Sequence, residues 1–179
     1  KKIGHAGTLD PKAEGVLPIA INKTTKLIPF INFDSKIYNF TIKWREQTLT
    51  DDAEGKIINY SKKIPQVNEI NQTTPSFLGY INQIPPKASA IKVKGKRAYS
   101  LLRDHKIFKL QPKKVFLKEF KLLYSENDTS KFSIECGKGF YVRSLARDLA
   151  IRLGTFGHVI DLKRTKVGNF DYKRSILLD

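Results

Sequence analysis

The chain has 179 residues, enough for one domain with a sizeable hydrophobic core, and its apolar fraction of 40% argues against a disordered tail. The sequence contains no apolar stretch long enough to cross a membrane, and Cys136, its single cysteine, excludes an intrachain disulfide, which suits the reducing cytoplasm. The formal net charge of +16 favours a polyanionic partner, nucleic acid or an anionic membrane, although a lysine-rich surface can also serve solubility alone.

The first predicted element is a loop over residues 4–11, because this stretch holds two glycines and an Asp-Pro pair. A residue before proline avoids the α conformation, so Asp10 is expected to lie on non-helical backbone. Residues 16–21 then predict a short buried strand. A helix is expected after it, capped by Thr24 or Thr25.

Residues 36–44 predict a strand with one buried face, since apolar and polar side chains alternate. The apolar face would carry Tyr38, Phe40, Ile42 and Trp44. A polar turn is expected at 48–55 and a strand at 56–60. Residues 65–78 have helical spacing that Pro75 interrupts.

The second half predicts two more strands, at 115–124 and 131–136, joined by a hairpin turn at 126–130. The best helix spans 141–153 and ends at Gly154, and Arg143 and Arg147 fall one turn apart on it. Strands with scattered helices and no βαβ rhythm indicate an α+β fold, with a mixed, mostly antiparallel sheet flanked by helices. We expect one domain over 1–179, with a basic insertion at about 86–114.

This insertion, hereafter the basic segment (residues 86–114), belongs to the most basic stretch of the chain. Between Lys87 and Lys118 there are eleven Lys and Arg side chains against one acidic residue, Asp104. A short helix is expected within it at 98–105. Such a density of like charge is unfavourable unless something anionic lies against it, so this stretch predicts the contact surface for the partner.

Three residues could carry chemistry, although each has an ordinary interpretation from its local sequence. Asp10 could belong to a simple Asp-Pro turn, Arg143 could be a solvated helix arginine, and Tyr38 could be a sheet-core aromatic. The three histidines lack zinc-ligand spacing, and no glycine-rich phosphate loop or dinucleotide fingerprint is present. We therefore expect neither a metal nor a cofactor.

A longer pattern resolves these local ambiguities. Gly4-His-Ala-Gly-Thr-Leu-Asp-Pro-Lys-Ala-Glu-Gly-Val-Leu-Pro18 resembles the signature of the TruB family of tRNA pseudouridine synthases. The resemblance continues through 36–38, 48–55, 83–99, 138–149 and 157–165, so it covers nearly the whole chain in order. Arg45, Leu49 and Phe140 depart from residues common in the family. The family's N-terminal strand and C-terminal RNA-binding domain are expected to be missing.

The resemblance implies a pseudouridine synthase fold and isomerisation of uridine 55 in the T-loop of tRNA. It implies that Asp10 is the essential carboxylate, Arg143 its ion-pair partner and Tyr38 the aromatic against the target base. His5 would lie near the flipped nucleotide and Leu162 beneath the site. The basic segment would be a mobile thumb over the T-arm, with Lys92, Lys94, Lys96 and Arg97 as substrate contacts. A cytoplasmic monomer without metal or cofactor would then suffice.

Three other interpretations stay open at this point. A catalytically idle RNA-binding module or chaperone would explain the charge but not the joint occurrence of Asp10, Tyr38 and Arg143. A guide-dependent archaeal or eukaryotic relative shares the Gly-Thr-Leu-Asp-Pro core, although the long basic segment favours the stand-alone bacterial type. Binding to a membrane surface is weakest, because no basic amphipathic helix with an aromatic apolar face occurs.

Overall fold

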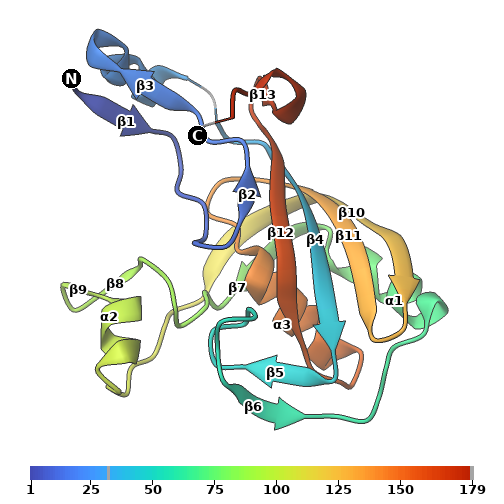
Figure 1. Ribbon diagram of the computed structural model, residues 1–179. Helices are drawn as coiled ribbons and strands as arrows, with labels where there is room; N and C mark the ends of the chain where they lie inside the picture. The colour runs from blue at the N-terminus through green and yellow to red at the C-terminus, as the bar shows by residue number, and fades with distance from the viewer. Residues whose placement is uncertain (32, 178–179) are drawn as a thin grey trace.

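The computed structural model describes residues 1–31 and 33–177, and a single seven-stranded sheet organises most of them (Figure 1). Its order is β13 (Phe170–Asp171), β12 (Gly157–Val167), β4 (Lys36–Trp44), β11 (Thr129–Cys136), β10 (Lys113–Glu126) and β7 (Gly79–Gln83). Neighbours along this path are antiparallel, whereas β2 (Glu14–Gly15) pairs with β12 in parallel. The predicted α+β fold with a mostly antiparallel sheet is confirmed.

The core lies on one face of this sheet, beneath α3 (Val142–Arg152), α1 (Val67–Thr73) and the 3₁₀ helix η2 (Thr74–Phe77). The strand predicted at 36–44 has those bounds as β4, and its apolar face is buried as expected. Phe40 stacks on Phe132 of β11, with ring centroids 5.4 Å apart. The indole nitrogen of Trp44 donates to Ser130 Oγ at 2.8 Å, so the one polar atom of this large side chain is satisfied.

The helix predicted at 141–153 is α3, and it ends where Gly154 adopts a φ of +72°, a conformation that costs glycine little. The interrupted helix at 65–78 divides into α1 and η2, with Pro75 at the start of η2. The predicted hairpin of β10 and β11 forms, and both strands are longer than expected.

Several strands were not expected from the sequence, and β7 and β12 are the longest of them. β12 is the more important, because it lies beside β4 in the middle of the sheet. Its pairing with β4 shifts register twice, between Val159 and Asp161 and between Arg164 and Lys166. Each irregularity disrupts the period-two alternation from which a strand is recognised.

The N-terminal residues form an arm that projects from the sheet, built from β1 (Ile3–His5), β3 (Ile19–Ile21) and the 3₁₀ helix η1 (Asn22–Phe30) (Figure 1). The buried strand predicted at 16–21 is wrong, since only 19–21 are a strand and Ile19 and Ile21 are exposed. The predicted cap is also wrong. η1 is preceded by Ile21 and has no buried residue, so no apolar stripe stabilises an α-helix there.

Two small hairpins complete the fold (Figure 1). β5 (Glu46–Thr48) pairs with β6 (Ile57–Tyr60) around the polar turn, which agrees with the sequence prediction. The basic segment carries β8 (Lys92–Val93), β9 (Lys96–Arg97) and α2 (Ala98–Arg103), and it projects away from the sheet. A last 3₁₀ turn, η3 (Tyr172–Arg174), follows β13. Within the described residues, no helix is long and apolar enough to span a membrane.

Candidate active site

Asp10 lies in a loop between β1 and β3, hereafter the Asp10 loop (residues 6–18). The ends of the loop are joined by a hydrogen bond from Ala6 N to Pro18 O of 3.0 Å. Inside it, Ala13 N donates to Asp10 O at 2.9 Å, so the chain turns directly after the Asp-Pro pair. The Asp10 side chain is 40% exposed and therefore accessible to a ligand.

Arg143, in the first turn of α3, brings four polar groups together although only 5% of its side chain is exposed. Its Nη2 atom donates to Asp10 Oδ1 at 2.8 Å and to Ala88 O at 3.2 Å. Its Nη1 atom donates to Asp52 Oδ2 at 3.0 Å and to Thr50 O at 3.1 Å. The planar guanidinium can hold several acceptors at fixed angles, so Arg143 orients the Asp10 carboxylate.

Asp52 is a second carboxylate at this site, which the sequence analysis treated only as part of a polar turn. Thr50 Oγ1 and Glu54 N donate to Asp52 Oδ1 at 2.5 and 3.0 Å, so the turn holds this carboxylate in place. Arg143 thus lies between two carboxylates. Among the described residues, its buried Nε atom has no hydrogen-bond partner. A signal was available, because Thr-x-Thr-x-Asp places polar side chains where they can bond within one turn.

One helical turn further along α3, Arg147 fixes the same turn from the other side. Its Nη1 donates to Asp51 Oδ2 at 2.8 Å, and its Nε donates to Asp148 Oδ1 at 3.0 Å. Burial raises the pKa of Asp51, and the Arg147 guanidinium opposes that shift. Asp51 also has a positive φ of 61°, and its carbonyl accepts from Val159 N at 3.1 Å. The Arg147–Asp51 pair therefore anchors the turn that presents Asp52.

Hydrogen bonds connect the residues that lead into the basic segment to the first turns of α3. The buried Gln83 side chain exchanges hydrogen bonds with both the N–H and the C=O of Tyr141, at 3.0 and 3.2 Å. Ile84 O accepts from Ser144 Oγ at 2.8 Å and from Arg147 Nη2 at 2.7 Å. Together with the Arg143–Ala88 contact, these bonds connect the base of the basic segment to Asp10 through one guanidinium.

Tyr38 lies on β4, directly opposite Arg164 of β12, and only 9% of it is exposed. The pKa of Tyr38 is raised to about 12, mainly because burial leaves the phenolate poorly solvated, and the charge of Asp10 contributes to that rise. Burial also raises the pKa of the half-buried Tyr141, and the Asp10 charge adds to that shift. Two neutral phenols therefore lie near Asp10, one of which, Tyr141, the sequence analysis missed.

Two hollows lie beside the Asp10 loop, and Asp10 itself lines only the smaller one. The smaller, of about 40 Å³, has room for a few waters only, and it is lined by Asp10, Asp52, Arg143 and Leu162 among others. The larger, of about 890 Å³, is lined by His5, Phe30, Lys36, Tyr38, Tyr141 and Arg164 among others. The structure thus brings Asp10, Arg143 and Leu162 together around the smaller hollow. It places Tyr38 with His5 in the larger hollow, which Gly7 and Thr8 of the Asp10 loop also line.

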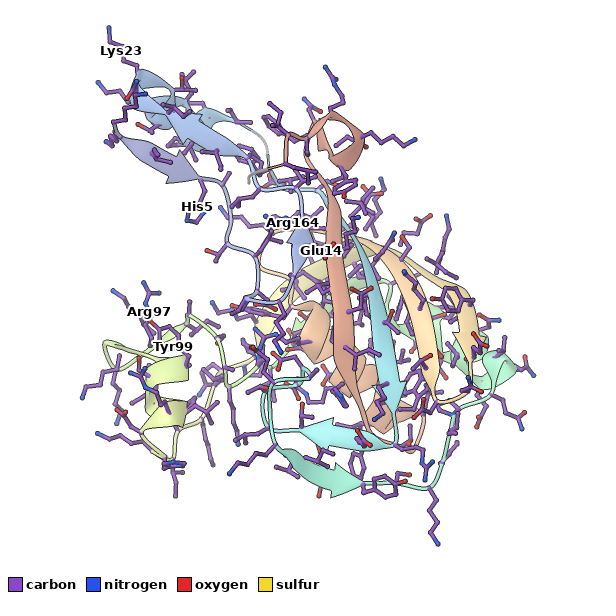
Figure 2. All side chains as sticks on the ribbon, in the orientation of Figure 1. His5, Glu14, Lys23, Arg97, Tyr99 and Arg164 are labelled. Carbon is purple, nitrogen blue, oxygen red and sulfur yellow. The ribbon has the colours of Figure 1, made fainter. Side chains whose placement is uncertain are left out.

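The four basic residues predicted to contact the substrate lie outside both hollows. Lys92, Lys94, Lys96 and Arg97 are all exposed on the β8–β9 hairpin and line neither hollow. Figure 2 shows Arg97 on this hairpin and His5 at the base of the arm, on different elements that flank the sheet. Among the described residues, no group of three or more His, Cys, Asp or Glu side chains could hold a metal ion.

Comparison with known proteins places the whole chain in one family. Residues 1–142 match the model of the TruB family pseudouridylate synthase (N terminal domain), and residues 143–179 match that of the tRNA pseudouridylate synthase B C-terminal domain. The chain belongs to the TruB family. Strand β12 of the second stretch pairs with β4 of the first, so both matched stretches contribute to one TruB-type sheet.

Curated relatives of this TruB-family chain match it over its full length. The tRNA pseudouridine synthase B of Wolbachia pipientis subsp. Culex pipiens is 48% identical over 181 residues, which cover 100% of this chain and 51% of that protein. The enzyme of the same name from Ehrlichia ruminantium is 51% identical, with 100% and 61% covered. The chain therefore spans between about half and three fifths of the length of these relatives.

Solved structures share the fold. A Cbf5-Nop10-Gar1 complex contains a chain that is 27% identical with a TM-score of 0.70, over 96% of this chain and 42% of that one. A Cbf5 chain of the archaeal box H/ACA sRNP Nop10-Cbf5 complex has a TM-score of 0.67 at 22% identity, with 96% and 40% covered. These likenesses confirm the pseudouridine synthase fold that the sequence pattern implied.

Proposed function

We propose that the protein is a tRNA pseudouridine synthase that isomerises uridine 55 in the T-loop, with Asp10 as the essential carboxylate. The observation that carries this proposal is the Arg143–Asp10 ion pair, 2.8 Å from Nη2 to Oδ1, which lines the smaller hollow, while Gly7 and Thr8 of the same loop line the larger one. Family membership and the printed name of the curated relatives, tRNA pseudouridine synthase B, support it.

The reaction needs a positioned carboxylate and no energy source. The N1–C1′ bond of the uridine breaks and a C5–C1′ bond forms, while C5 loses a proton and N1 gains one, so the composition is unchanged. Asp10 would act as nucleophile or as base at the ribose or the uracil. Arg143 would keep one carboxylate oxygen occupied at a fixed angle, so the other oxygen is directed toward the substrate.

The larger hollow is the place we assign to the flipped nucleotide. Its volume of about 890 Å³ lies in the range of small-molecule sites, whereas the smaller one holds only a few waters. A base that leaves its stack gains from an aromatic surface, which Tyr38 and Tyr141 would offer. His5 would contact the same nucleotide or its neighbour, and Leu162 would form the floor beside Asp10.

The basic segment would bind the phosphates of the T-arm through Lys92, Lys94, Lys96 and Arg97, and would close over the RNA as a thumb. Phosphate contacts position nucleic acid without reading its sequence. We further propose that the protein acts in the cytoplasm as a monomer. The relatives at 48–51% identity favour this stand-alone type over the guide-dependent one, whose representatives above are 22–27% identical.

The decisive experiment compares Asp10→Asn with the wild type in the intact protein that contains these 179 residues. The RNA is a T-arm hairpin labelled with tritium at C5 of its uridines, because formation of the C5–C1′ bond releases that tritium to solvent. Isomerisation of unlabelled uridine leaves the mass unchanged, so a mass measurement would not detect it. We expect Asp10→Asn to bind the hairpin like the wild type and to release no tritium. Asp128→Asn, a change of the same kind in the β10–β11 turn, serves as the control.

Two outcomes would contradict the proposal. Undiminished tritium release by Asp10→Asn would exclude this carboxylate as the essential group. Tight binding of the hairpin by the wild type with no release at all would favour the idle RNA-binding module.

A further inference from the structure

Arg164 is a fully buried arginine on β12 whose hydrogen bonds go to the main chain of the Asp10 loop. Its exposed fraction is 1%, which is unusual for a charged side chain. Nε donates to Val16 O at 2.9 Å, Nη2 to Gly7 O at 3.0 Å and Nη1 to Thr8 O at 3.3 Å. In Figure 2 its label lies where the N-terminal arm meets the sheet, close to Glu14 of the Asp10 loop.

The three acceptors lie on both sides of Asp10 in the chain. Gly7 and Thr8 precede the carboxylate, and Val16 follows it, so one guanidinium closes the loop across its base. The main chain of Arg164 adds a fourth bond, because its carbonyl accepts from Val16 N at 2.8 Å. A buried guanidinium is stable only when its N–H groups are satisfied, so the loop must keep this shape for Arg164 to stay buried.

The same guanidinium also connects this loop to Tyr38. Arg164 and Tyr38 are paired residues of β12 and β4, and both line the larger hollow. The charge of Arg164 and its hydrogen bond to the Tyr38 side chain both lower the pKa of that phenol, against the larger effect of burial. The Arg164 guanidinium on β12 therefore contacts both the Asp10 loop and the Tyr38 hydroxyl group.

We infer that Arg164 is a positioning residue for the reaction at Asp10, which holds the Asp10 loop at the distance from Arg143 and Tyr38 that the chemistry requires. This inference rests on the proposed function, and the role it assigns is one of position, because the guanidinium of Arg164 contacts the main chain of the Asp10 loop and not the Asp10 carboxylate. Arg143 fixes the end of the Asp10 side chain, whereas Arg164 fixes the main chain that carries it.

The geometry leaves little room for another arrangement of the loop. Gly15 has a φ of +113°, and a Cβ atom there would lie 2.1 Å from Arg164 O. The parallel pairing of β2 with β12 depends on this close approach. Lysine cannot replace Arg164, because a single ammonium lacks the three planar N–H directions that reach Val16, Thr8 and Gly7.

The test is Arg164→Lys in the intact protein, with the tritiated T-arm hairpin as the probe. The single-turnover rate at saturating RNA and the dissociation constant of the hairpin are measured separately, and folding is checked by circular dichroism and thermal melting. We expect the rate constant to fall by about 100-fold, as displacement of a reacting group by about 1 Å does, while the dissociation constant changes by less than about threefold.

The matched control is Arg152→Lys, the same change at the far end of α3, where the guanidinium donates to Ser76 Oγ and stacks on Phe77. It should lower the melting temperature slightly and leave the rate constant within about twofold of wild type. A purely structural role of Arg164 predicts a lower melting temperature with an unchanged rate per folded molecule. An Arg164→Lys protein that is folded and turns over at half the wild-type rate or faster would overturn the inference.

A second measurement keeps the inference testable if Arg164→Lys fails to fold. In the wild-type protein, the amide protons of Ala13 and Val16 should exchange slowly, because Ala13 N donates to Asp10 O within the loop and Val16 N donates to Arg164 O on β12. Exchange of both at the rate of an unfolded chain would show that the loop is not held, and would equally overturn the inference. Failure of the proposed function is distinguishable, since then the wild type itself releases no tritium.

Discussion

Asp10 and Arg143 lie 133 positions apart in the chain, yet Asp10 Oδ1 and Arg143 Nη2 are 2.8 Å apart. Two different elements bring them together, the Asp10 loop anchored on β12 and the first turn of α3. Arg143 is almost fully buried and Asp10 is 40% exposed, so the pair has one fixed member and one accessible member. That asymmetry suits a carboxylate that must meet a substrate.

Arg143→Lys should abolish most of the activity without preventing RNA binding. An ammonium can pair with Asp10 but cannot also bridge Asp52, Thr50 O and Ala88 O in fixed directions. We expect the single-turnover rate constant to fall by about 100-fold or more, with the dissociation constant of a T-arm hairpin changed by only a few-fold. Tritium release at saturating enzyme measures the first quantity and filter binding the second. A rate within tenfold of wild type would show that charge alone suffices.

Arg147→Met should destabilise the fold strongly, because it leaves Asp51 buried without its partner. The cost of one uncompensated buried carboxylate is about 3–5 kcal/mol of unfolding free energy. The double variant Asp51→Asn/Arg147→Met removes both charges and should recover a large part of that loss. Urea unfolding of the two single variants and the double variant measures the coupling. Additive losses would mean that the 2.8 Å ion pair contributes nothing to the position of this turn.

Neutralising the β8–β9 hairpin should weaken RNA binding in a salt-dependent way. In the variant Lys92→Gln/Lys96→Gln, the slope of log K against log salt should decrease by about one for each RNA phosphate that the protein no longer neutralises. The turnover rate at saturating RNA should stay close to wild type, since neither lysine lines a hollow. Lys62→Gln/Lys121→Gln removes the same charge elsewhere and is the control. Equal slopes for both double variants would exclude a specific role for the hairpin.

Cys136 should be unreactive in the folded protein and should contribute to alkaline instability. Burial raises the pKa of its thiol from 9.0 to about 12, so the folded state disfavours the thiolate. The unfolded chain ionises above pH 9, so the stability that this thiol contributes is complete below pH 9 and is lost as the pH rises toward 12.

Two measurements check this expectation. A thiol reagent at pH 8 should modify Cys136 only after the protein is unfolded. The unfolding free energy of Cys136→Ala should decline less steeply between pH 9 and 10 than that of the wild type, since Tyr38, whose pKa rises from 10.0 to about 12, contributes only at higher pH. Rapid modification of the folded protein at pH 8 would contradict the burial of this side chain.

The sequence alone determined the elements whose side chains repeat regularly. The alternation of β4 and the three-and-four spacing of α3 gave their positions, because burial on one face imposes that period on the residues. The signature around Asp10 determined the family, and with it the expectation that Asp10, Tyr38 and Arg143 meet. The positions of β4 and α3 and the family signature can therefore be recognised from residues that are close together in the sequence.

Only the tertiary structure decided how the site is held. The strand β12 was not predicted, because two register shifts break the alternation of its side chains. The role of Arg164 on β12 was therefore not predicted either, since its hydrogen-bond partners lie 148 to 157 positions away in the chain. Arg147 and Asp52 likewise acquire a role only through partners 96 and 91 positions distant. Hydrogen bonds from a side chain to distant main-chain or carboxylate oxygens leave no periodic trace in the sequence, since any residue supplies a carbonyl.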